Sequence, residues 1–325
     1  MNAIVYEKYG PPGVLEIREI DKPVPKADEV LIRNHAASVT RYDCWMRSST
    51  SPPGFGLMMR LATGLLRPKQ PILGTELSGV VEEVGRDVSR FKKGDKVFAY
   101  LGMKLGAYAQ YICIPEDGVL APKPPNLTFE EATAVQQGAL TALYFLKNGK
   151  IGKGQKVLVY GASGGVGAYA VQLAGYFGAG VTGVCSTQKM DWVKSLGAEK
   201  VIDYTREDFT KGNDTYDIVF DTVGKTSISR TRKLLKNEGR YLFTTFGLPK
   251  LFRILGYQMT GGKAFYGTLE EKTKDLLFLK GLLETGKIRA VVDKIFPMEE
   301  AVEAHRYVES GEKKGSVVIT ISTEN

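Results

Sequence analysis

Hydrophobic and polar positions divide the chain into two regions of different spacing. Residues 1–125 contain short runs of strand-forming residues punctuated by glycine and proline, which predicts a mainly β domain built on a partly closed sheet. The N-terminal segment MNAIVYEKYG also predicts a strand, and it lacks the basic and apolar regions of a secretory signal. The clearest internal runs are Glu29–His35, Leu77–Val84, Lys96–Ala99 and Ala109–Ile114.

Helical spacing begins after Asn126, where Thr128 and Glu131 form the sequence pattern of a capping box. We expect a helix through the 130s and a second helix at 139–148. Strands and helices then alternate, which predicts a parallel, doubly wound sheet. The expected strands are 156–160, 180–185, 200–203, 217–221 and 240–245, and the expected helices are 166–177, 189–196 and 226–236.

The C-terminal region predicts helices at 270–286 and 298–310, and a strand, Ser316–Ile321, that we expect to return to the first domain. The expected fold class is therefore α/β, with a doubly wound parallel sheet and a mainly β second domain. The expected boundaries are 1–125, completed by 264–325, for the β domain and 126–263 for the doubly wound domain.

Composition narrows the class of protein. The chain has 325 residues, 43% of them hydrophobic and 25% charged, which is typical of a globular protein. Its three cysteines, Cys44, Cys113 and Cys185, are far apart and odd in number, which favours a reducing, cytoplasmic compartment over a disulfide framework. The formal net charge of +8 would suit nucleic acid or an anionic cofactor, but the basic residues are spread along the chain, so we favour a solvated basic surface.

The stretch from Val157 to Gln188 carries no charge and is long enough to span a membrane. Its glycines break it into strand, turn, helix and strand, which we favour over a span. The strand Lys156–Tyr160 leads into a glycine-rich loop, and glycines lacking a Cβ let the backbone approach a pyrophosphate at a helix N-terminus. The loop therefore predicts dinucleotide binding of the Rossmann type through Ala162, Ser163, Gly164, Gly165 and Val166, with Gly167 packing the helix against the sheet.

The end of the second strand distinguishes NAD from NADP. An NAD enzyme usually places an acidic residue there for the ribose hydroxyls. This chain has Cys185, Ser186 and then Lys189, with no acid among them, and a lysine attracts a 2′-phosphate. We therefore expect NADPH, although a solvated surface lysine remains the simpler explanation of Lys189. Asp191 stands nearby, where it suits the first turn of a helix.

The glycine-rich run and its flanks, from Gly154 through Gly167 to Gln172, resemble the signature of the quinone oxidoreductase and zeta-crystallin family, although Gly175 departs from it. The resemblance covers almost the whole chain. It includes PKADEVLIRNHAASVTRYD, ILGTELSGVVEEVG, FKKGDKVFA and GAYAQYICIPED, and, in the second domain, LGAEKVIDY and YDIVFDTVG. The family is part of the medium-chain dehydrogenases/reductases, so the resemblance implies a GroES-like catalytic domain beside the Rossmann domain.

The resemblance also implies roles for single residues. Lys189 and Tyr204 would grip the 2′-phosphate of NADPH, with Ser186 as a further candidate. Thr40 would lie near the nicotinamide, Trp45 would cover the ring and substrate or simply line the pocket wall, and Thr141 would place a hydroxyl beside the nicotinamide. The stretch Thr244–Gly247, which includes Phe246, would hold the carboxamide. Tyr42 and Tyr108 are weaker candidates for a proton donor.

Zinc is not expected. Relatives that bind zinc carry two cysteines and a histidine where this chain has Thr40, Gln137 and Thr75, and none of these is a soft ligand. Glu76 remains, but one carboxylate cannot hold the metal. Without a metal to stabilise an alkoxide, acceptors that take hydride readily are favoured.

We therefore expect an NADPH-dependent reductase of quinones or activated enones, acting on a small hydrophobic substrate and forming a homodimer. One alternative is a metal-free NADP-dependent alcohol or carbonyl oxidoreductase, and another is a crystallin-like protein that binds NADPH or RNA. The segments 53–69 and 249–263 are apolar with interleaved basic residues, which suits a lipophilic substrate mouth or a membrane surface. For membrane contact, we favour the simpler explanation that both are packed helices.

Overall fold

The computed structural model describes residues 1–50, 56–244 and 247–322, which divide into two compact units. Unit 1 holds described residues up to 137 and from 271 onward, and unit 2 holds those between 138 and 270. No helix among the described residues is long and apolar enough to cross a membrane. The uncharged stretch 157–188 instead forms a strand, a helix and a further strand of unit 2.

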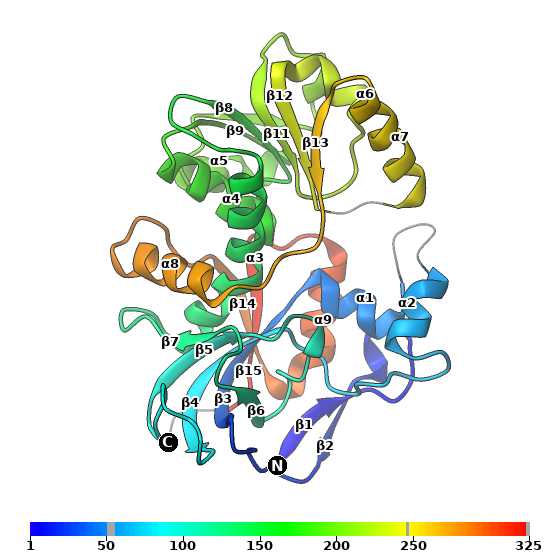
Figure 1. Ribbon diagram of the computed structural model, residues 1–325. Coiled ribbons are helices and arrows are strands. Elements are labelled where there is room, and N and C mark those ends of the chain that lie inside the picture. The colour runs from blue at the N-terminus through cyan, green and yellow to red at the C-terminus, as the bar shows by residue number, and fades with distance from the viewer. Residues whose placement is uncertain (51–55, 245–246, 323–325) are drawn as a thin grey trace. The chain divides into compact units, whose positions relative to one another are not determined.

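Unit 2 is built on a parallel sheet, which in the described residues has six strands in the order β10-β9-β8-β11-β12-β13 (Figure 1). The chain starts at β8 and winds outward in both directions, so the strand order reverses at β8, where a doubly wound sheet binds ligands. The strands are β8 (Lys156–Tyr160), β9 (Gly180–Cys185), β10 (Lys200–Asp203), β11 (Tyr216–Asp221), β12 (Leu235–Phe243) and β13 (Lys263–Tyr266).

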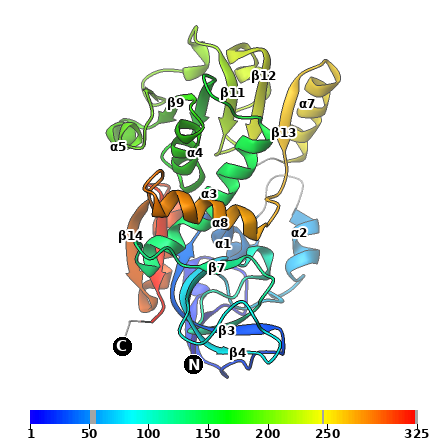
Figure 2. The ribbon, with the colours of Figure 1, turned by 60° about the vertical axis from the view of Figure 1, so that its left-hand side comes forward.

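The helices of unit 2 pack on this sheet through apolar faces, α4 against β8 and β9 and α5 against β9 and β10. Figure 2 shows α4 and α5 on the side of the sheet near β9, and α7 beside β13. The helical elements are α4 (Gly165–Tyr176), η3 (Thr187–Lys189), α5 (Met190–Ser195), η4 (Phe209–Lys211), α6 (Ile228–Thr231), η5 (Arg232–Leu234) and α7 (Leu248–Met259).

Two expectations for unit 2 were wrong in detail. The expected helix at 226–236 ends early, because Leu235 already pairs with Tyr216 as the first residue of β12. The two helices expected at the 130s and 139–148 are one helix, α3 (Phe129–Asn148), which begins in unit 1 and ends in unit 2. Gly138 lies inside this helix, where a Cβ would be 2.6 Å from the carbonyl oxygen of Gly165, so the glycine permits close packing rather than a break.

Unit 1 contains a largely antiparallel sheet, whose seven strands in the described residues run β14-β15-β3-β4-β5-β7 with β6 also paired to β3. The last strand of the chain, β15, pairs with β3, which confirms that the C-terminus returns to the first domain. The strands are β3 (Glu29–Val39), β4 (Glu76–Val84), β5 (Lys96–Tyr100), β6 (Tyr111–Pro115), β7 (Leu120–Pro122), β14 (Val292–Pro297) and β15 (Ser316–Thr320).

A separate ribbon of β1 (Asn2–Val5) and β2 (Glu16–Glu19), together with a core of Val, Leu, Ile and aromatic side chains, completes unit 1. The capping box at the start of α3 is confirmed, since Thr128 Oγ1 accepts from Glu131 N at 3.2 Å and Glu131 Oε2 accepts from Thr128 N at 2.9 Å. The remaining helices of unit 1 are α1 (Arg41–Ser48), α2 (Gly56–Thr63), α8 (Thr273–Glu284) and α9 (Ala301–Ser310), with short turns η1 (Pro12–Val14), η2 (Gly102–Lys104) and η6 (Met298–Glu300).

Candidate cofactor and active site

The glycine-rich loop of unit 2 is a tight turn between β8 and α4. Gly161 has a φ of +84°, and a Cβ there would overlap the side chain of Val223. A Cβ at Gly167 would overlap the carbonyl oxygen of Gly161, so α4 starts against the loop itself. The backbone N–H groups of Gly161 and Ala162 both donate to Val184 O at 3.1 Å, which ties the loop to β9. Both glycines are therefore required by the fold.

Gly164 differs from these two glycines. It caps α4 without any side-chain hydrogen bond, and a Cβ there would meet only Gly161 O, at an ordinary 3.4 Å. The loop residues Ser163, Gly164, Gly165 and Val166 are half-buried rather than covered by protein. The first N–H groups of a helix have no partner within the helix, so this end presents donors and the positive end of the helix dipole. The loop thus fits the pyrophosphate of a dinucleotide.

The residues expected to read the 2′-phosphate gather at the carboxyl ends of β9 and β10. Ser186 precedes the turn η3 and Lys189 is its last residue; Lys189 N donates to Ser186 O at 2.9 Å. Tyr204 N donates to Cys185 O at 3.1 Å, which brings the two strand ends together. The Tyr204 ring is 52% exposed and packs edge-on against Tyr160. Burial raises the pKa of the Cys185 thiol to about 11, so this residue is a neutral packing group beside them.

Sequence reasoning missed an acidic residue beside this turn. Asp203 ends β10 directly opposite Cys185, and it is only 5% exposed. Its carboxylate accepts from Thr187 Oγ1, from Thr205 N at 2.9 Å and from Thr205 Oγ1 at 2.7 Å, and these bonds, led by that of Thr187, lower its pKa. Because its oxygens already bind these donors, Asp203 orders the two turns. The bond to its own i+2 backbone is typical of an Asp-x-Thr turn, which was a readable signal.

A second buried carboxylate, that of Asp221, holds the turn that contacts the glycine-rich loop. Asp221 ends β11, and its two oxygens accept from the backbone N–H groups of Val223 (3.1 Å) and Gly224 (2.7 Å), from Tyr241 OH (3.0 Å) and from Lys250 Nζ (3.0 Å). Lys250 reaches it from α7. The turn after β11 is thus held in place, and its Val223 side chain presses on Gly161.

For the remaining described site residues expected in unit 2, the structure gives a position in the fold but no contact that indicates a role. Thr141 lies half-buried on α3. Thr244 follows β12 and its hydroxyl donates to Thr222 O at 3.3 Å. Phe246, expected near the carboxamide, lies outside the described residues.

In unit 1, Thr40 is the N-cap of α1. Its hydroxyl and its backbone N–H donate to Asp43 Oδ2 at 2.5 and 2.8 Å, and Asp43 also accepts from Gly74 N at 3.0 Å. Burial raises the pKa of Asp43 to about 6. The Thr40 hydroxyl is therefore engaged in a helix cap, a role that the expected contact with nicotinamide did not anticipate.

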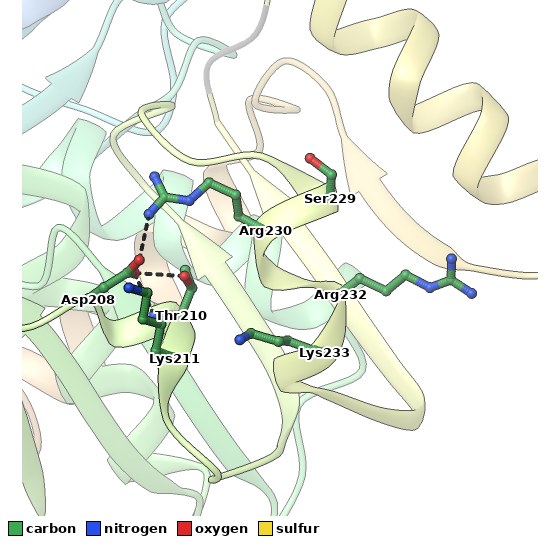
Figure 3. Close-up of a pocket in the computed structure, with 7 residues that line it drawn as sticks. All are labelled: Asp208, Thr210, Lys211, Ser229, Arg230, Arg232 and Lys233. Atoms are coloured by element: carbon green, nitrogen blue, oxygen red, sulfur yellow. Dashed lines mark hydrogen bonds and ion pairs between the residues drawn. The ribbon is translucent and has the colours of Figure 1, made fainter.

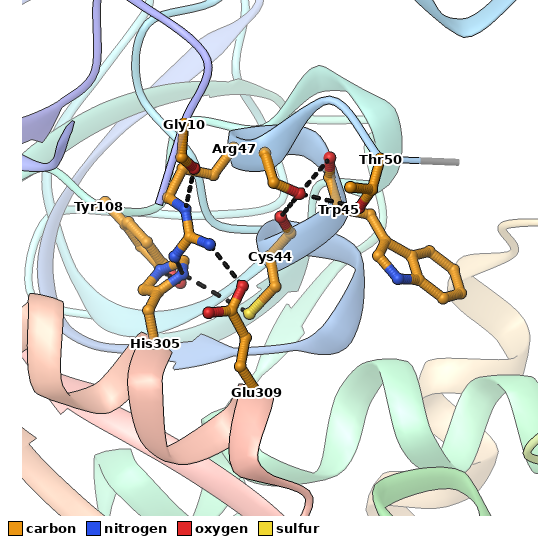
Figure 4. Close-up of polar contacts among 9 residues, drawn as sticks. Gly10, Cys44, Trp45, Arg47, Thr50, Tyr108, His305 and Glu309 are labelled. Atoms are coloured by element: carbon orange, nitrogen blue, oxygen red, sulfur yellow. Dashed lines mark hydrogen bonds and ion pairs between the residues drawn. The ribbon is translucent and has the colours of Figure 1, made fainter. Parts of the chain in front are cut away.

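One face of α1 rests on a buried polar network (Figure 4). Arg47, only 1% exposed, donates to Gly10 O at 3.2 Å and pairs with Glu309. Its guanidinium lies 3.2 Å from His305 Nδ1, and the other ring nitrogen of His305, Nε2, lies 3.3 Å from Tyr108 OH. Burial, with the Arg47 charge, lowers the pKa of His305 to about 3, so the imidazole is neutral and accepts from Arg47.

Figure 4 also shows the indole of Trp45 pointing away from this network, on a part of α1 that is half-buried. The Trp45 ring therefore lies outside the polar network that holds Arg47. Tyr108 is fully buried, and its hydroxyl donates to Ser38 O at 3.3 Å. Tyr42 stays half-buried, and burial raises its pKa.

The three places at which zinc-binding relatives carry ligands do not fit the metal. Thr40 caps α1, Thr75 is fully buried and its hydroxyl has no hydrogen-bond partner among the described residues, and Gln137 belongs to α3. Glu76 beside them accepts from Ser38 Oγ and Gln137 N, and burial raises its pKa to about 7. Among the described residues, no group of three or more His, Cys, Asp or Glu side chains could hold a metal ion.

Of the two expected apolar segments, 56–63 and 249–259 are helical, in α2 and α7, whereas 64–69 and 260–262 form bends and turns and residues 53–55 lie outside the described range. Several of their large side chains face outward: Leu61, Leu65 and Leu66 in unit 1, and Phe252, Leu255 and Met259 in unit 2.

Comparison with known proteins agrees with both units. Residues 26–125 match the alcohol dehydrogenase GroES-like domain, and residues 196–319 match a family described as zinc-binding dehydrogenase. The 2-methylene-furan-3-one reductase of Solanum lycopersicum is 33% identical over 98% of this chain and 79% of its own length. The quinone oxidoreductase of Coxiella burnetii is 30% identical over 99% of each chain, with a TM-score of 0.89.

A third relative is the Escherichia coli quinone oxidoreductase, whose structure was determined in complex with NADPH. It is 28% identical over 98% of this chain and all of its own, with a TM-score of 0.85. These matches run through both units, and the fold, with a GroES-like domain and a Rossmann domain, is the one the sequence predicts. The chain therefore belongs to the quinone oxidoreductase family of the medium-chain dehydrogenases/reductases.

Proposed function

We propose that this protein is a metal-free, NADPH-dependent reductase of quinones or activated enones. The glycine-rich loop supports the proposal most strongly, because Gly161 and Gly167 form a closed turn, whereas a Cβ at Gly164, the N-cap of α4, would meet only an ordinary contact among the described residues. The names of the relatives, a quinone oxidoreductase and a furanone reductase among them, point to the same chemistry.

When bound, NADPH would supply the hydride, and a proton from water would complete the reduction of the acceptor. The residues of unit 2 would bind and orient the cofactor: Ala162 through Val166 at the pyrophosphate, and Ser186, Lys189 and Tyr204 at the 2′-phosphate. Asp203 would hold the turn that carries Lys189, through its bond from Thr187. Thr141 in unit 2 and Thr40 and Trp45 in unit 1 are proposed as residues near the reacting groups.

A panel of acceptors tests this function. We expect NADPH oxidation, followed at 340 nm by the loss of absorbance, with quinones or with enones, and little reduction of NADP with simple alcohols. The Gly164→Val variant should keep the fold, because its Cβ meets only an ordinary contact, yet lose NADPH turnover. Alcohol oxidation by NADP with no quinone or enone reduction would instead establish the alcohol dehydrogenase alternative. NADPH binding without turnover of any acceptor would reject an enzymatic role.

We further propose a homodimer and a cytoplasmic location. The edge strand β13 of unit 2 supports the first, because its outer side has no strand partner among the described residues. The cysteines, which are all unpaired, support a reducing compartment. Light scattering that finds a dimer at micromolar concentration, and cell fractionation, test the two proposals separately.

A further inference from the structure

A basic hollow with a volume of about 500 Å³ lies in unit 2 between the turn η4 and the helical turns α6 and η5. It is lined by Asp208, Thr210, Lys211, Ser229, Arg230, Arg232 and Lys233, which are drawn in Figure 3. Four of these side chains are basic and one is acidic, so the lining carries a net charge of +3. None of them belongs to the glycine-rich loop or to the turn that carries Lys189.

The charges of the hollow are mostly uncompensated. Asp208 accepts from Thr210 N at 3.0 Å and pairs with Arg230 at 3.1 Å. In the part of the chain that the structure describes, Lys211, Arg232 and Lys233 form no ion pair with a carboxylate and no side-chain hydrogen bond. Like charges gathered in a hollow raise the local concentration of anions. Figure 3 shows Lys233 extending toward Lys211, Asp208 and Arg230, whereas Arg232 is directed away from them.

The side chains that line the hollow also indicate which kind of anion would bind. Its residues are all charged or hydroxyl-bearing, with no aromatic ring and no Val, Leu, Ile or Met side chain, which favours a ligand bound through polar groups over one that carries an acyl chain. Lysine, arginine and hydroxyl groups are the donors that bind phosphate oxygens. We infer that this hollow is a binding site for a small phosphorylated molecule, separate from the dinucleotide site.

Asp208 would regulate the strength of this site. Its charge occupies Arg230 and opposes an incoming anion, while its Oδ1 holds the turn through Thr210. The Asp208→Asn variant keeps an acceptor for Thr210 N and removes the charge. It should therefore bind anions more tightly, the opposite of what most changes to a binding site do.

Calorimetric titration of the full-length protein with pyrophosphate tests the inference. With the dinucleotide site filled by saturating NADPH, we expect saturable 1:1 binding of pyrophosphate that weakens about tenfold or more in Lys211→Ala/Lys233→Ala and strengthens about three- to tenfold in Asp208→Asn. The matched control is Lys92→Ala/Lys93→Ala, which removes two exposed lysines of unit 1 and should change the affinity by less than about twofold.

Three results would overturn the inference. The first is pyrophosphate binding that NADPH abolishes and that the hollow variants leave unchanged, because the probe would then occupy the glycine-rich loop. The second is unsaturable binding in the wild type. The third is binding of a single-stranded oligonucleotide, or of vesicles with phosphoinositide headgroups, that is far tighter than pyrophosphate and is lost in Lys211→Ala/Lys233→Ala. That third result would assign the surface to a macromolecule or a membrane.

Discussion

The two units differ in where their candidate functional groups lie, although both also bury carboxylates, among them Asp203 and Asp221 in unit 2. Unit 2 presents backbone N–H groups and half-exposed side chains at the carboxyl edge of its sheet, around Gly164 and Lys189. Unit 1 buries full charges and titratable groups inside its core, among them Asp43, Arg47 and Glu76. The first arrangement is made by local sequence, whereas the second depends on contacts such as that of Arg47 with His305, which are 258 residues apart.

This difference separates groups that would bind the cofactor from groups that stabilise the fold. A helix N-terminus can bind a phosphate without any change in protonation, and the buried carboxylates of unit 2, Asp203 and Asp221, hold turns in place. The buried groups of unit 1 hold α1 and the start of β4 in position, and their ionisation is coupled to folding. Substitutions in unit 1 should therefore reduce stability first, and substitutions at the exposed edge of unit 2 should reduce cofactor binding first.

The largest expected effect is at Arg47. The Arg47→Met variant leaves the buried His305, the half-buried Gly10 O and the one-third-exposed Glu309 without their donor, which should lower the free energy of unfolding by about 3 kcal/mol. Arg18→Met is the control, because Arg18 forms only exposed ion pairs, which solvent screens and which contribute little to stability. Denaturant titrations measure both. Equal losses in the two variants would show that the network of Figure 4 contributes no more than a surface pair.

The next effect is the pH dependence of stability at Glu76. Its pKa is raised from 4.5 to about 7 in the folded protein, so folding favours the protonated carboxyl. The stabilisation is complete below pH 4.5 and is lost as the pH rises through 7. Relative to the wild type, Glu76→Gln should gain up to about 3 kcal/mol between these limits and nothing further above them. His305, whose pKa is lowered, contributes with the opposite sign, so the difference between the two proteins is the quantity to measure.

If that difference does not change with pH, Glu76 ionises normally in the folded state and the assignment of a buried carboxyl is wrong. A difference with the reverse slope would mean that a cation, rather than burial, governs this group.

A smaller effect separates two glycines of α4. Gly167→Ala would force a Cβ into the carbonyl oxygen of Gly161 and should cost about 1–3 kcal/mol, with loss of NADPH binding. Gly175→Ala meets nothing within 4 Å in the same helix, so it should be neutral or stabilise by up to about 1 kcal/mol. Thermal unfolding with and without NADPH compares them. Indistinguishable melting temperatures for the two variants would contradict the close approach of α4 to the loop.

The sequence predicted unit 2 well because its elements are set by short-range patterns. Strand β8 matches the expected range, and the loop after it was recognised from its glycines. The error at Gly138 arose because a glycine inside a helix can permit either a break or a close approach, and only the position of Gly165 distinguishes them. In unit 1, Thr40 and Asp43 have the spacing of a capping box, a readable signal that the sequence analysis missed, whereas the burial of Asp43 and its bond from Gly74 depend on a contact with a distant part of the sequence.

Cofactor discrimination tests the central claim most directly. The measurement is the ratio of kcat/KM for NADPH to that for NADH with one quinone, in the wild type, in Lys189→Ala and in Lys194→Ala, whose lysine is an exposed partner of Asp191 on α5. One charge-assisted bond to the 2′-phosphate is worth about 1.5–3 kcal/mol, so the wild type should favour NADPH by about tenfold or more. Lys189→Ala should lose most of this preference, Ser186→Asp should move it toward NADH, and Lys194→Ala should keep it. A wild type that uses NADH equally well, or a Lys189→Ala variant with an unchanged ratio, would contradict the account.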